Sequence, residues 1–187
     1  MFLFHQILLF IPDKISEHNY RAVGSRNPER SARVKSNRLR NKCKQTAKEI
    51  GLSDTKYSLV KWSEEIESNS AYAEALQSIK DLYQTNDEFR FEVQDSTAAA
   101  LRCMENGRRN GDGEICGSTS REEGIDIAEG AKYLLKELAF LNALSNIYEH
   151  CDRFVCVYHR PWPVLEKYFG GLYDNAVKSN LGFVVFE

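Results

Sequence analysis

The feature that most constrains the fold is an apolar run near the start of the chain that is followed by a long amphipathic segment. The run MFLFHQILLFI indicates a buried strand over about residues 4–12. Asn27 can cap a helix, Pro28 suits its first turn and Gly51 can end it. These signals predict a helix over residues 28–50. A buried strand followed by a helix is typical of α/β proteins with a parallel sheet.

The rest of the chain continues this alternation of strands and helices. Further strands are expected at residues 56–62, 153–159 and 181–187, helices starting at Ser63, Asn69 and Asp87, and loops at residues 13–27 and 106–119. Ser120 and Glu123 have the spacing of a capping box and predict the start of a helix that contains residues 131–141. Pro163 opens a short helix between the last two strands. We therefore expect one α/β domain.

Cysteine usage and the apolar start of the chain indicate the compartment. The five cysteines are an odd number with no C-x-x-C pair, which indicates free thiols in a reducing compartment and argues against zinc. The opening apolar run lacks a basic n-region and a cleavage site, and it is too short to span a bilayer. We expect a cytoplasmic monomer with no cofactor, no metal and no membrane partner.

Positive charge is concentrated in the first long helix. Residues 26–48 contain nine basic side chains and one acid, so this segment carries +8; because the whole chain carries −2, the remainder carries −10. The basic residues are Arg26, Arg30, Arg33, Lys35, Arg38, Arg40, Lys42, Lys44 and Lys48. Clustered Lys and Arg side chains favour a phosphate backbone as partner. The alternative is a solvated face that acids elsewhere in the fold balance.

The same helix has little apolar surface with which to pack. On a helical wheel Ala32, Leu39, Cys43 and Ile50 fall within one narrow seam. The sequence predicts that this seam packs against the domain and that the cationic remainder faces solvent.

One carboxylate stands inside an apolar helix. In the stretch AKYLLKELAFL, Glu137 falls on the same face as Phe140, Leu141 and Leu144. Because an unpaired carboxylate is costly to bury, something polar must meet it. Two explanations stay open: a structural carboxylate bonded to the backbone or to Tyr133 one turn earlier, or a pocket that receives a cation.

A tyrosine and a histidine follow the strand predicted at residues 153–159. Tyr158 and His159 lie where this strand ends, and ligands of α/β sheets bind at the carboxyl ends of strands. Such a pair by itself is more often structural than functional.

Three motifs in this order carry a family resemblance. They are the basic helix ERSARVKSNRLRNKCKQTAKEIG, the Y-x-x-x-E of YLLKE, and YHRPWP followed by LGFVVFE. Together they resemble the cyclodipeptide synthases over roughly residues 8–187. The resemblance implies an α/β fold with a Rossmann-type parallel sheet and flanking helices, similar to the catalytic domain of class I tyrosyl- and tryptophanyl-tRNA synthetases.

The resemblance also implies an activity and roles for individual residues. Enzymes of this family join the aminoacyl groups of two aminoacyl-tRNAs per turnover into a cyclic dipeptide, a diketopiperazine. Tyr133 and Glu137 would hold the α-amino group of the substrate, Tyr158 would relay a proton during cyclisation, and His159 follows it as in one branch of the family. The residues expected to bind the tRNA acceptor arm are Arg30, Arg33, Arg38, Arg40, Lys42 and Lys44.

One part of the family pattern has no counterpart. The family's nucleophile is a serine in a Gly-x-Ser-x-x-Asn loop, and the nearest string here is KISEHN, in which Lys14 replaces the glycine. Ser16 is therefore a poor candidate. Because this loop leads straight into the basic helix, we expect residues 1–187 to form a single cyclodipeptide-synthase-like domain that is incomplete at its N-terminus. The alternatives are an inactive fragment, an isoform or a non-catalytic homologue that binds tRNA; an aminoacyl-tRNA synthetase is disfavoured because no HIGH-like or KMSKS-like signature occurs.

Overall fold

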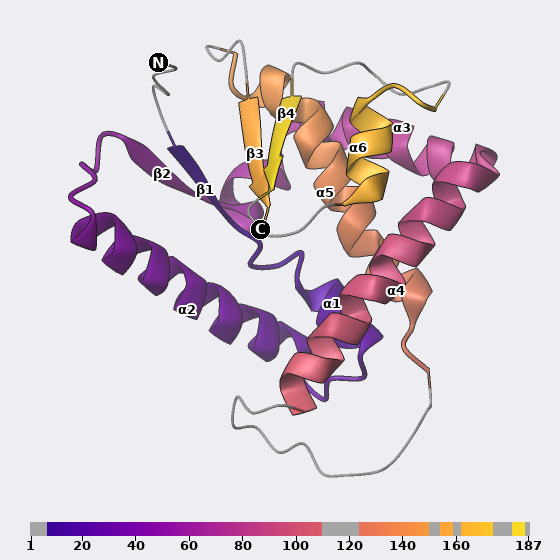
Figure 1. The fold of residues 1–187 in the computed structure, drawn as a ribbon, viewed down its shortest axis with the longest axis horizontal. Coiled ribbons are helices and arrows are strands. Elements are labelled where there is room, and N and C mark those ends of the chain that lie inside the picture. The colour runs from indigo at the N-terminus through magenta and orange to yellow at the C-terminus, as the bar shows by residue number, and fades with distance from the viewer. Residues whose placement is uncertain (1–6, 110–123, 150–153, 159–161, 174–180, 186–187) are drawn as a thin grey trace.

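The computed structural model describes residues 7–109, 124–149, 154–158, 162–173 and 181–185. In chain order its elements are β1 (Ile7–Ile11), α1 (Glu17–Ala22), α2 (Pro28–Glu49), β2 (Tyr57–Lys61), the π-helical turn η1 (Trp62–Ile66), α3 (Ser70–Thr85), α4 (Asp87–Arg109), α5 (Ile127–Ile147), β3 (Phe154–Tyr158), α6 (Pro163–Phe169) and β4 (Leu181–Val185). Figure 1 shows their arrangement.

The described strands form two parallel pairs. β1 pairs with β2 in the register Leu9 to Leu59, and β3 pairs with β4 in the register Cys156 to Phe183. Parallel strands need a crossover between them, and α2 provides the one between β1 and β2. The expected α/β class with parallel strands and flanking helices is therefore confirmed. Within the described residues the two pairs do not hydrogen-bond to each other.

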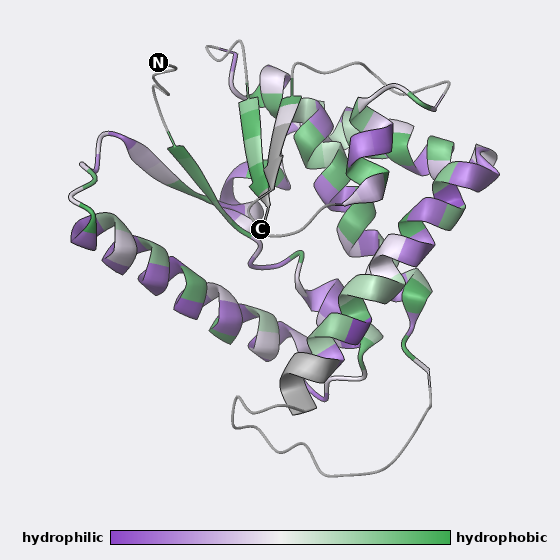
Figure 2. Ribbon diagram, viewed as in Figure 1, coloured by the Kyte–Doolittle hydropathy of each residue, from purple (hydrophilic) through white to green (hydrophobic). Residues whose placement is uncertain are grey.

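Helix α5 joins the two strand pairs. Phe10 of β1 stacks on Phe140 of α5 with ring centroids 5.1 Å apart. Tyr148, which caps α5, lies beside Phe154 of β3, with ring centroids 6.4 Å apart. The helices α1, α3 and α4 also pack against α5, which is the most hydrophobic helix in Figure 2. One core cluster consequently extends from the first strand to α6.

The long basic helix begins and ends where local signals predict. The Asn27 side chain accepts a hydrogen bond from the Arg30 amide at 3.0 Å, and Pro28 occupies the first turn. Gly51 follows the helix with φ of 68°, a conformation in the left-handed region that glycine adopts without strain. The helix boundaries predicted from the sequence are confirmed to within one residue.

The prediction of an uninterrupted loop at residues 13–27 is wrong, because this segment contains α1. A six-residue helix has no apolar periodicity that could reveal it. Contacts with the rest of the fold hold it instead: Ala22 is buried, Arg21 pairs with Glu17 at 2.8 Å within the helix, and His18 hydrogen-bonds to Glu129 of α5.

Three other boundaries differ from expectation. α5 begins at Ile127, and Asp126 rather than Ser120 caps it by accepting a hydrogen bond from the Glu129 amide at 2.9 Å. The predicted capping box and residues 110–119 of the predicted loop lie outside the described residues, while residues 106–109 still belong to α4. The helix expected to start at Ser63 is the short π-helical turn η1, which already begins at Trp62. None of the helices in the described part of the chain has the length and apolarity needed to cross a membrane.

Candidate functional site

Glu137 is buried at the centre of the domain. Only 7% of its surface is exposed, and its neighbours along α5, Leu138 and Leu134, are among the core residues. Burial of a carboxylate in apolar surroundings requires polar or charged company. The prediction that Glu137 faces the core is confirmed.

The negative charge of Glu137 raises the pKa of two other side chains. The pKa of the Tyr133 hydroxyl lies well above its usual value because the group is buried and because Glu137 is negative. For the same two reasons the pKa of the Cys156 thiol rises to about 12. The carboxylate of Glu137 thus acts electrostatically on a side chain of its own helix and on a side chain of β3.

Cys156 is a site neighbour that sequence reasoning missed. It lies on β3, where the exposure alternates between the half-buried Phe154 and Cys156 and the exposed Val155 and Val157. This alternation places Cys156 on the side of the strand that faces α5. The usable signal in the sequence was its position two residues before Tyr158, since residues two apart on a strand share a face.

Of the other two predicted catalytic residues, Tyr158 lies within the described part of the chain. Tyr158 is the last residue of β3 and pairs with Val185 of β4. It therefore lies at the carboxyl end of a parallel strand, as expected. His159 lies outside the described residues.

Ser16 remains a poor candidate for a nucleophile. It precedes α1, and its hydroxyl donates a hydrogen bond to the Pro12 carbonyl. Lys14, which occupies the place of the family's glycine, forms an ion pair with Glu67 of the segment after η1 at 2.7 Å. No general base contacts the Ser16 hydroxyl among the described residues. This arrangement holds the loop in place but does not activate an oxygen.

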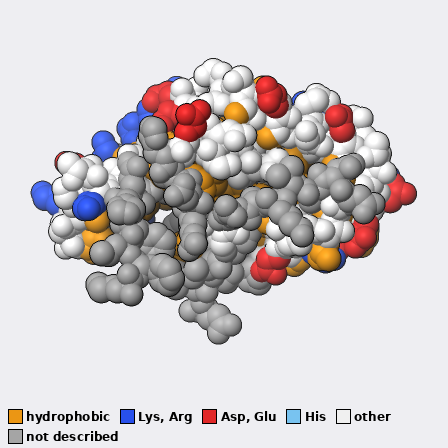
Figure 3. Space-filling view, turned by 90° about the horizontal axis from the view of Figure 1, so that it is seen from above, with side chains coloured by type: hydrophobic (Ala, Val, Ile, Leu, Met, Phe, Trp, Pro, Cys, Tyr) orange, Lys and Arg blue, Asp and Glu red, His pale blue; other side chains and the backbone are white. Residues whose placement is uncertain are grey.

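The basic helix α2 presents most of its surface to solvent. Among the predicted tRNA-binding residues, Arg40 is half-buried and the others are exposed: Arg30, Arg33, Arg38, Lys42 and Lys44. α2 is mostly hydrophilic in Figure 2, and Lys and Arg side chains gather at the left end of Figure 3, where α2 lies in Figure 1. The six basic side chains make no ion pair with other described residues. Their charge is thus available to an anionic partner.

The packed seam of α2 differs from the predicted one. Leu39 is 38% exposed and Ile50 is 69% exposed, whereas Ser36 and Ala47 are buried together with Ala32. The Ser36 hydroxyl is satisfied by the carbonyl of Ala32 at 2.7 Å, so a small polar residue can be buried here. Small side chains let the helix approach the domain closely, which hydrophobicity alone does not reveal.

Within the described residues no group of three or more His, Cys, Asp or Glu side chains is placed to hold a metal ion.

The family model of cyclodipeptide synthases matches this chain over residues 1–187. The chain belongs to the cyclodipeptide synthase family. The family and its structural relatives are aminoacyl-tRNA-dependent transferases, and the resemblance drawn from the three motifs is confirmed.

Solved cyclodipeptide synthases share the fold. The enzyme from Bacillus thermoamylovorans has 21% identity and a TM-score of 0.74, over 97% of this chain and 74% of that chain. AlbC, a cyclodipeptide synthase from Streptomyces noursei, has 17% identity and a TM-score of 0.69, over 98% of this chain and 82% of that chain. The cyclodipeptide synthase from Candidatus Glomeribacter gigasporarum, bound to Phe-tRNAPhe, has 22% identity and a TM-score of 0.59, over 97% of this chain and 68% of that chain. No curated protein matches the sequence.

Proposed function

We propose that this protein is a tRNA-dependent cyclodipeptide synthase that joins the aminoacyl groups of two aminoacyl-tRNAs into a diketopiperazine. The observation that carries the proposal is the buried carboxylate of Glu137, whose charge raises the pKa of both Tyr133 and Cys156. An α-ammonium group is the cation that an aminoacyl ester brings into such a site. The charge-assisted hydrogen bond between the two would orient the amine that has to attack.

The remaining roles follow from the family pattern and the places of the residues. Tyr133 lies one turn before Glu137 on α5 and would share the α-amino group with it. Tyr158, at the carboxyl end of β3, would relay the proton that the amine loses during ring closure, with His159 beside it in sequence. The basic residues of α2 would hold the acceptor arms of the tRNAs. We propose that residues 1–187 act as a monomeric domain in the cytoplasm, where aminoacyl-tRNAs are made.

The direct test is product formation. The protein is incubated with a mixture of aminoacyl-tRNAs, and cyclic dipeptides are detected by mass spectrometry. We expect a cyclic dipeptide that forms only when aminoacyl-tRNA is present. Treating the aminoacyl-tRNA with ribonuclease before the protein is added should abolish its formation. Glu137→Gln is the matched control, because it keeps the shape of the side chain and removes its charge. Product from Glu137→Gln at the wild-type rate would contradict the role of Glu137.

A second candidate function is tRNA binding without catalysis. It is favoured by Ser16, whose hydroxyl is engaged by the Pro12 carbonyl and has no base beside it among the described residues. This candidate predicts that aminoacyl-tRNA binds through α2, that no cyclic dipeptide forms, and that the bound aminoacyl ester stays intact. Measuring both binding and product on one preparation separates the two functions.

A further inference from the structure

One side of α2 and the carboxyl ends of β1 and β2 border a pocket of about 480 Å³. This volume is within the usual range for sites that bind small molecules. Ile11, which ends β1, and Lys61, which ends β2, both line it. The other walls are the segment after β1 and the side of α2 that carries Arg30, Arg33 and Arg40. The carboxyl ends of parallel strands are the usual place for a ligand in α/β folds.

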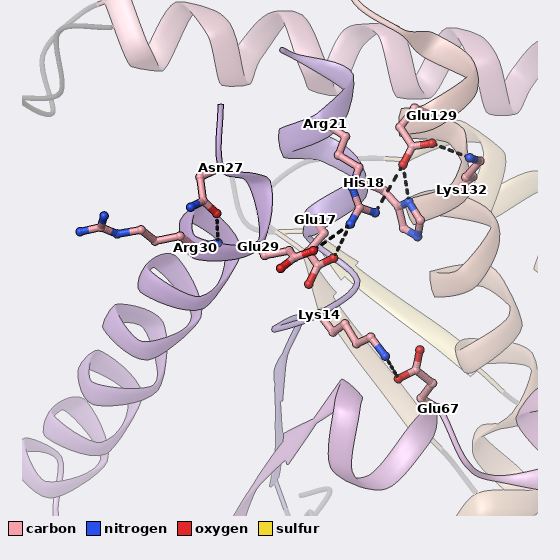
Figure 4. A network of polar contacts seen from close by, with 10 residues as sticks. All are labelled: Lys14, Glu17, His18, Arg21, Asn27, Glu29, Arg30, Glu67, Glu129 and Lys132. Carbon is pink, nitrogen blue, oxygen red and sulfur yellow. Dashed lines mark hydrogen bonds and ion pairs between the residues drawn. The ribbon is translucent and has the colours of Figure 1, made fainter. Parts of the chain in front are cut away.

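The three acids of the pocket are held by groups that do not line it. Both oxygens of Asp13 accept hydrogen bonds from Ser63, one from its amide at 3.1 Å and one from its hydroxyl at 2.5 Å. Glu17 and Glu29 pair with Arg21, at 2.8 Å and 3.7 Å. Figure 4 shows these two carboxylates turned toward Arg21. Within the described residues, none of the three carboxylates pairs with a cation of the pocket.

The five cations of the pocket divide into two groups. Each lysine pairs with a glutamate outside the pocket, Lys14 with Glu67 and Lys61 with Glu64. The arginines form no ion pair within the described part of the chain: Arg30, Arg33 and Arg40. The Nε of Arg40 is moreover buried without a hydrogen-bond partner among the described residues. A buried donor that stays unpaired is costly, so these arginines call for an anionic ligand with acceptor atoms.

The arginines of the pocket share one side of α2, next to its buried seam. At about 100° per residue, Arg30, Arg33 and Arg40 fall within about 80° of one another around the helix. The neighbouring direction is that of the buried residues Ala32, Ser36 and Ala47. Lys35 and Lys42 lie on the opposite side and do not line the pocket. The packed domain therefore borders the pocket arginines but not the other basic side.

The spacing of the three arginines indicates an elongated ligand. Arg30 and Arg33 are one turn apart, so both can reach the same anionic group. Arg40 starts about 10 Å further along the helix, and its Nε–H needs an acceptor there. The fork of N–H donors on a guanidinium matches the oxygens of a phosphate, and a phosphate monoester carries more than one negative charge at pH 7. A nucleotide has this layout, with a phosphate at one end and a base with acceptor atoms at the other.

We propose that this pocket binds a free phosphate monoester of nucleotide size, with the phosphate held by Arg30 and Arg33 and an acceptor atom of the ligand at Arg40 Nε. The site goes beyond the proposed function, which needs no free nucleotide. It takes these three arginines from the set expected to bind tRNA and leaves the other basic residues of α2 to that partner. A small ligand suits the place because strand ends, the segment after β1 and α2 all line it, whereas a nucleic acid backbone needs only exposed charge.

The test is isothermal titration calorimetry of the full chain with three probes: adenosine 5′-monophosphate (AMP), adenosine and inorganic phosphate. We expect one AMP to bind per chain, phosphate to bind more weakly because it does not reach Arg40, and adenosine to give no measurable binding. Arg30→Ala/Arg33→Ala should weaken AMP binding at least about 10-fold, because hydrogen bonds to a charged group are lost. The matched control is Lys35→Ala/Lys42→Ala, which removes the same charge from the opposite side of α2 and should change the Kd of AMP little.

Arg40→Met tests the far end of the site. The variant keeps an apolar stem and removes the buried donor, so it should lower the affinity for AMP toward that for phosphate and leave phosphate binding unchanged. Because Arg30 and Arg33 are exposed, their double variant should keep the wild-type Tm, and its result does not depend on how well position 40 tolerates substitution.

Several results would overturn the proposed pocket. Adenosine or inorganic phosphate that bound as tightly as AMP would contradict the class of ligand. Equal weakening of AMP by the two double variants, or no binding of AMP and phosphate at millimolar concentration, would contradict the site. A blunt RNA hairpin should leave the Kd of AMP unchanged, and competitive displacement of AMP by it would make the three arginines part of an RNA-binding surface instead. The assay for cyclic dipeptides is independent of these titrations, so the proposed function stands or falls separately.

Discussion

His18 Nδ1 lies 2.8 Å from Glu129 Oε1, and this pair joins α1 to the first turn of α5 (Figure 4). Arg21 and Lys132 approach the same carboxylate, at 3.9 Å and 2.5 Å. Because a carboxylate can only accept, the neutral His18 ring donates its Nδ1–H to Glu129. The segment after β1 is thereby attached to the helix that carries Glu137.

This pair predicts a loss of stability in acid. Burial lowers the pKa of His18 below 6.5, although the hydrogen bond to Glu129 acts in the opposite direction. At a pH between the pKa of His18 in the folded protein and its ordinary value, the unfolded chain binds a proton on His18 that the folded protein does not. The free energy of unfolding therefore falls as the pH drops below about 6.5. We expect the Tm to decrease from pH 7 to pH 5, and His18→Gln to remove this part of the pH dependence. An identical slope in both proteins would show that His18 does not cause it.

Protonation of Glu129 should lower the stability further at lower pH. Burial raises its pKa, but the hydrogen bonds from Lys132 and His18 outweigh burial and bring it below 4.5. A carboxylate with a lowered pKa contributes stability that is lost as the pH falls through its folded value. We expect Glu129→Gln to lower the Tm at pH 7 and to flatten the acid limb below pH 4.5 in thermal unfolding scans.

Gly130 is expected to tolerate no side chain. A Cβ at this position would lie 2.7 Å from Leu101 Cδ1 and 2.9 Å from Thr97 Cγ2, and both residues are buried. Gly130→Ala should destabilise the fold by about 1–3 kcal/mol in urea unfolding, as overpacked cores do. The matched control is Gly182→Ala, where the nearest atoms would lie 3.9 Å away. Equal stability of the two variants would mean that α4 and α5 can separate without cost.

The charge of Glu137 should be visible in the reactivity of a thiol. Burial and Glu137 hold the pKa of Cys156 at about 12, so it should react slowly with iodoacetamide at pH 8 while the exposed Cys103 reacts fast. Glu137→Gln should lower the pKa of Cys156 and increase its alkylation rate, measured by peptide mass spectrometry. The rate at Cys103 serves as the internal control and should not change.

Glu137 and Tyr133 should matter for chemistry more than for folding. Glu137→Gln should fold, and cyclic dipeptide formation should fall by about 10- to 150-fold, because a hydrogen bond to a charged group is worth about 1.5–3 kcal/mol. Tyr133→Phe should reproduce a milder defect. A lower Tm with activity in proportion to the folded protein would instead support a structural carboxylate.

Neutralising the basic helix should weaken tRNA binding and flatten its dependence on salt. Alanine at Arg38, Arg40, Lys42 and Lys44 together should reduce the log–log salt slope by about 0.9 for each phosphate that the helix no longer neutralises. The Tm should change little, because these side chains form no ion pair with other described residues. Lys80→Ala/Arg102→Ala, on the exposed surfaces of α3 and α4, is the control and should leave the slope unchanged. An unchanged slope in the quadruple variant would favour the solvated-face explanation.

The predictable part of this protein consists of features with a local cause. Asn27, Pro28 and Gly51 define α2 because capping and backbone conformation act within one turn. Asn69 likewise caps α3 through the amides of Ala71 and Tyr72. The ordered motifs around Tyr133 and Tyr158 were sufficient for the family. Glu137 was predictable as a core-facing residue because helical periodicity places it on the same face as the apolar residues around it.

The tertiary structure decided what depends on contacts between distant segments. α1 is stabilised through His18 and Glu129, which are 111 residues apart in sequence, so no local pattern reveals it. Ser36 and Ala47 pack where Leu39 and Ile50 were expected, because close approach to the domain selects small side chains over hydrophobic ones. Cys156 is half-buried and feels the charge of Glu137 from a different element, and Arg30, Arg33 and Arg40 share a pocket only because one forms beneath one side of α2. Short-range physics allowed the sequence to predict elements with local signals such as α2 and α3, whereas burial and charge pairing across the core determined α1 and which side chains share a site.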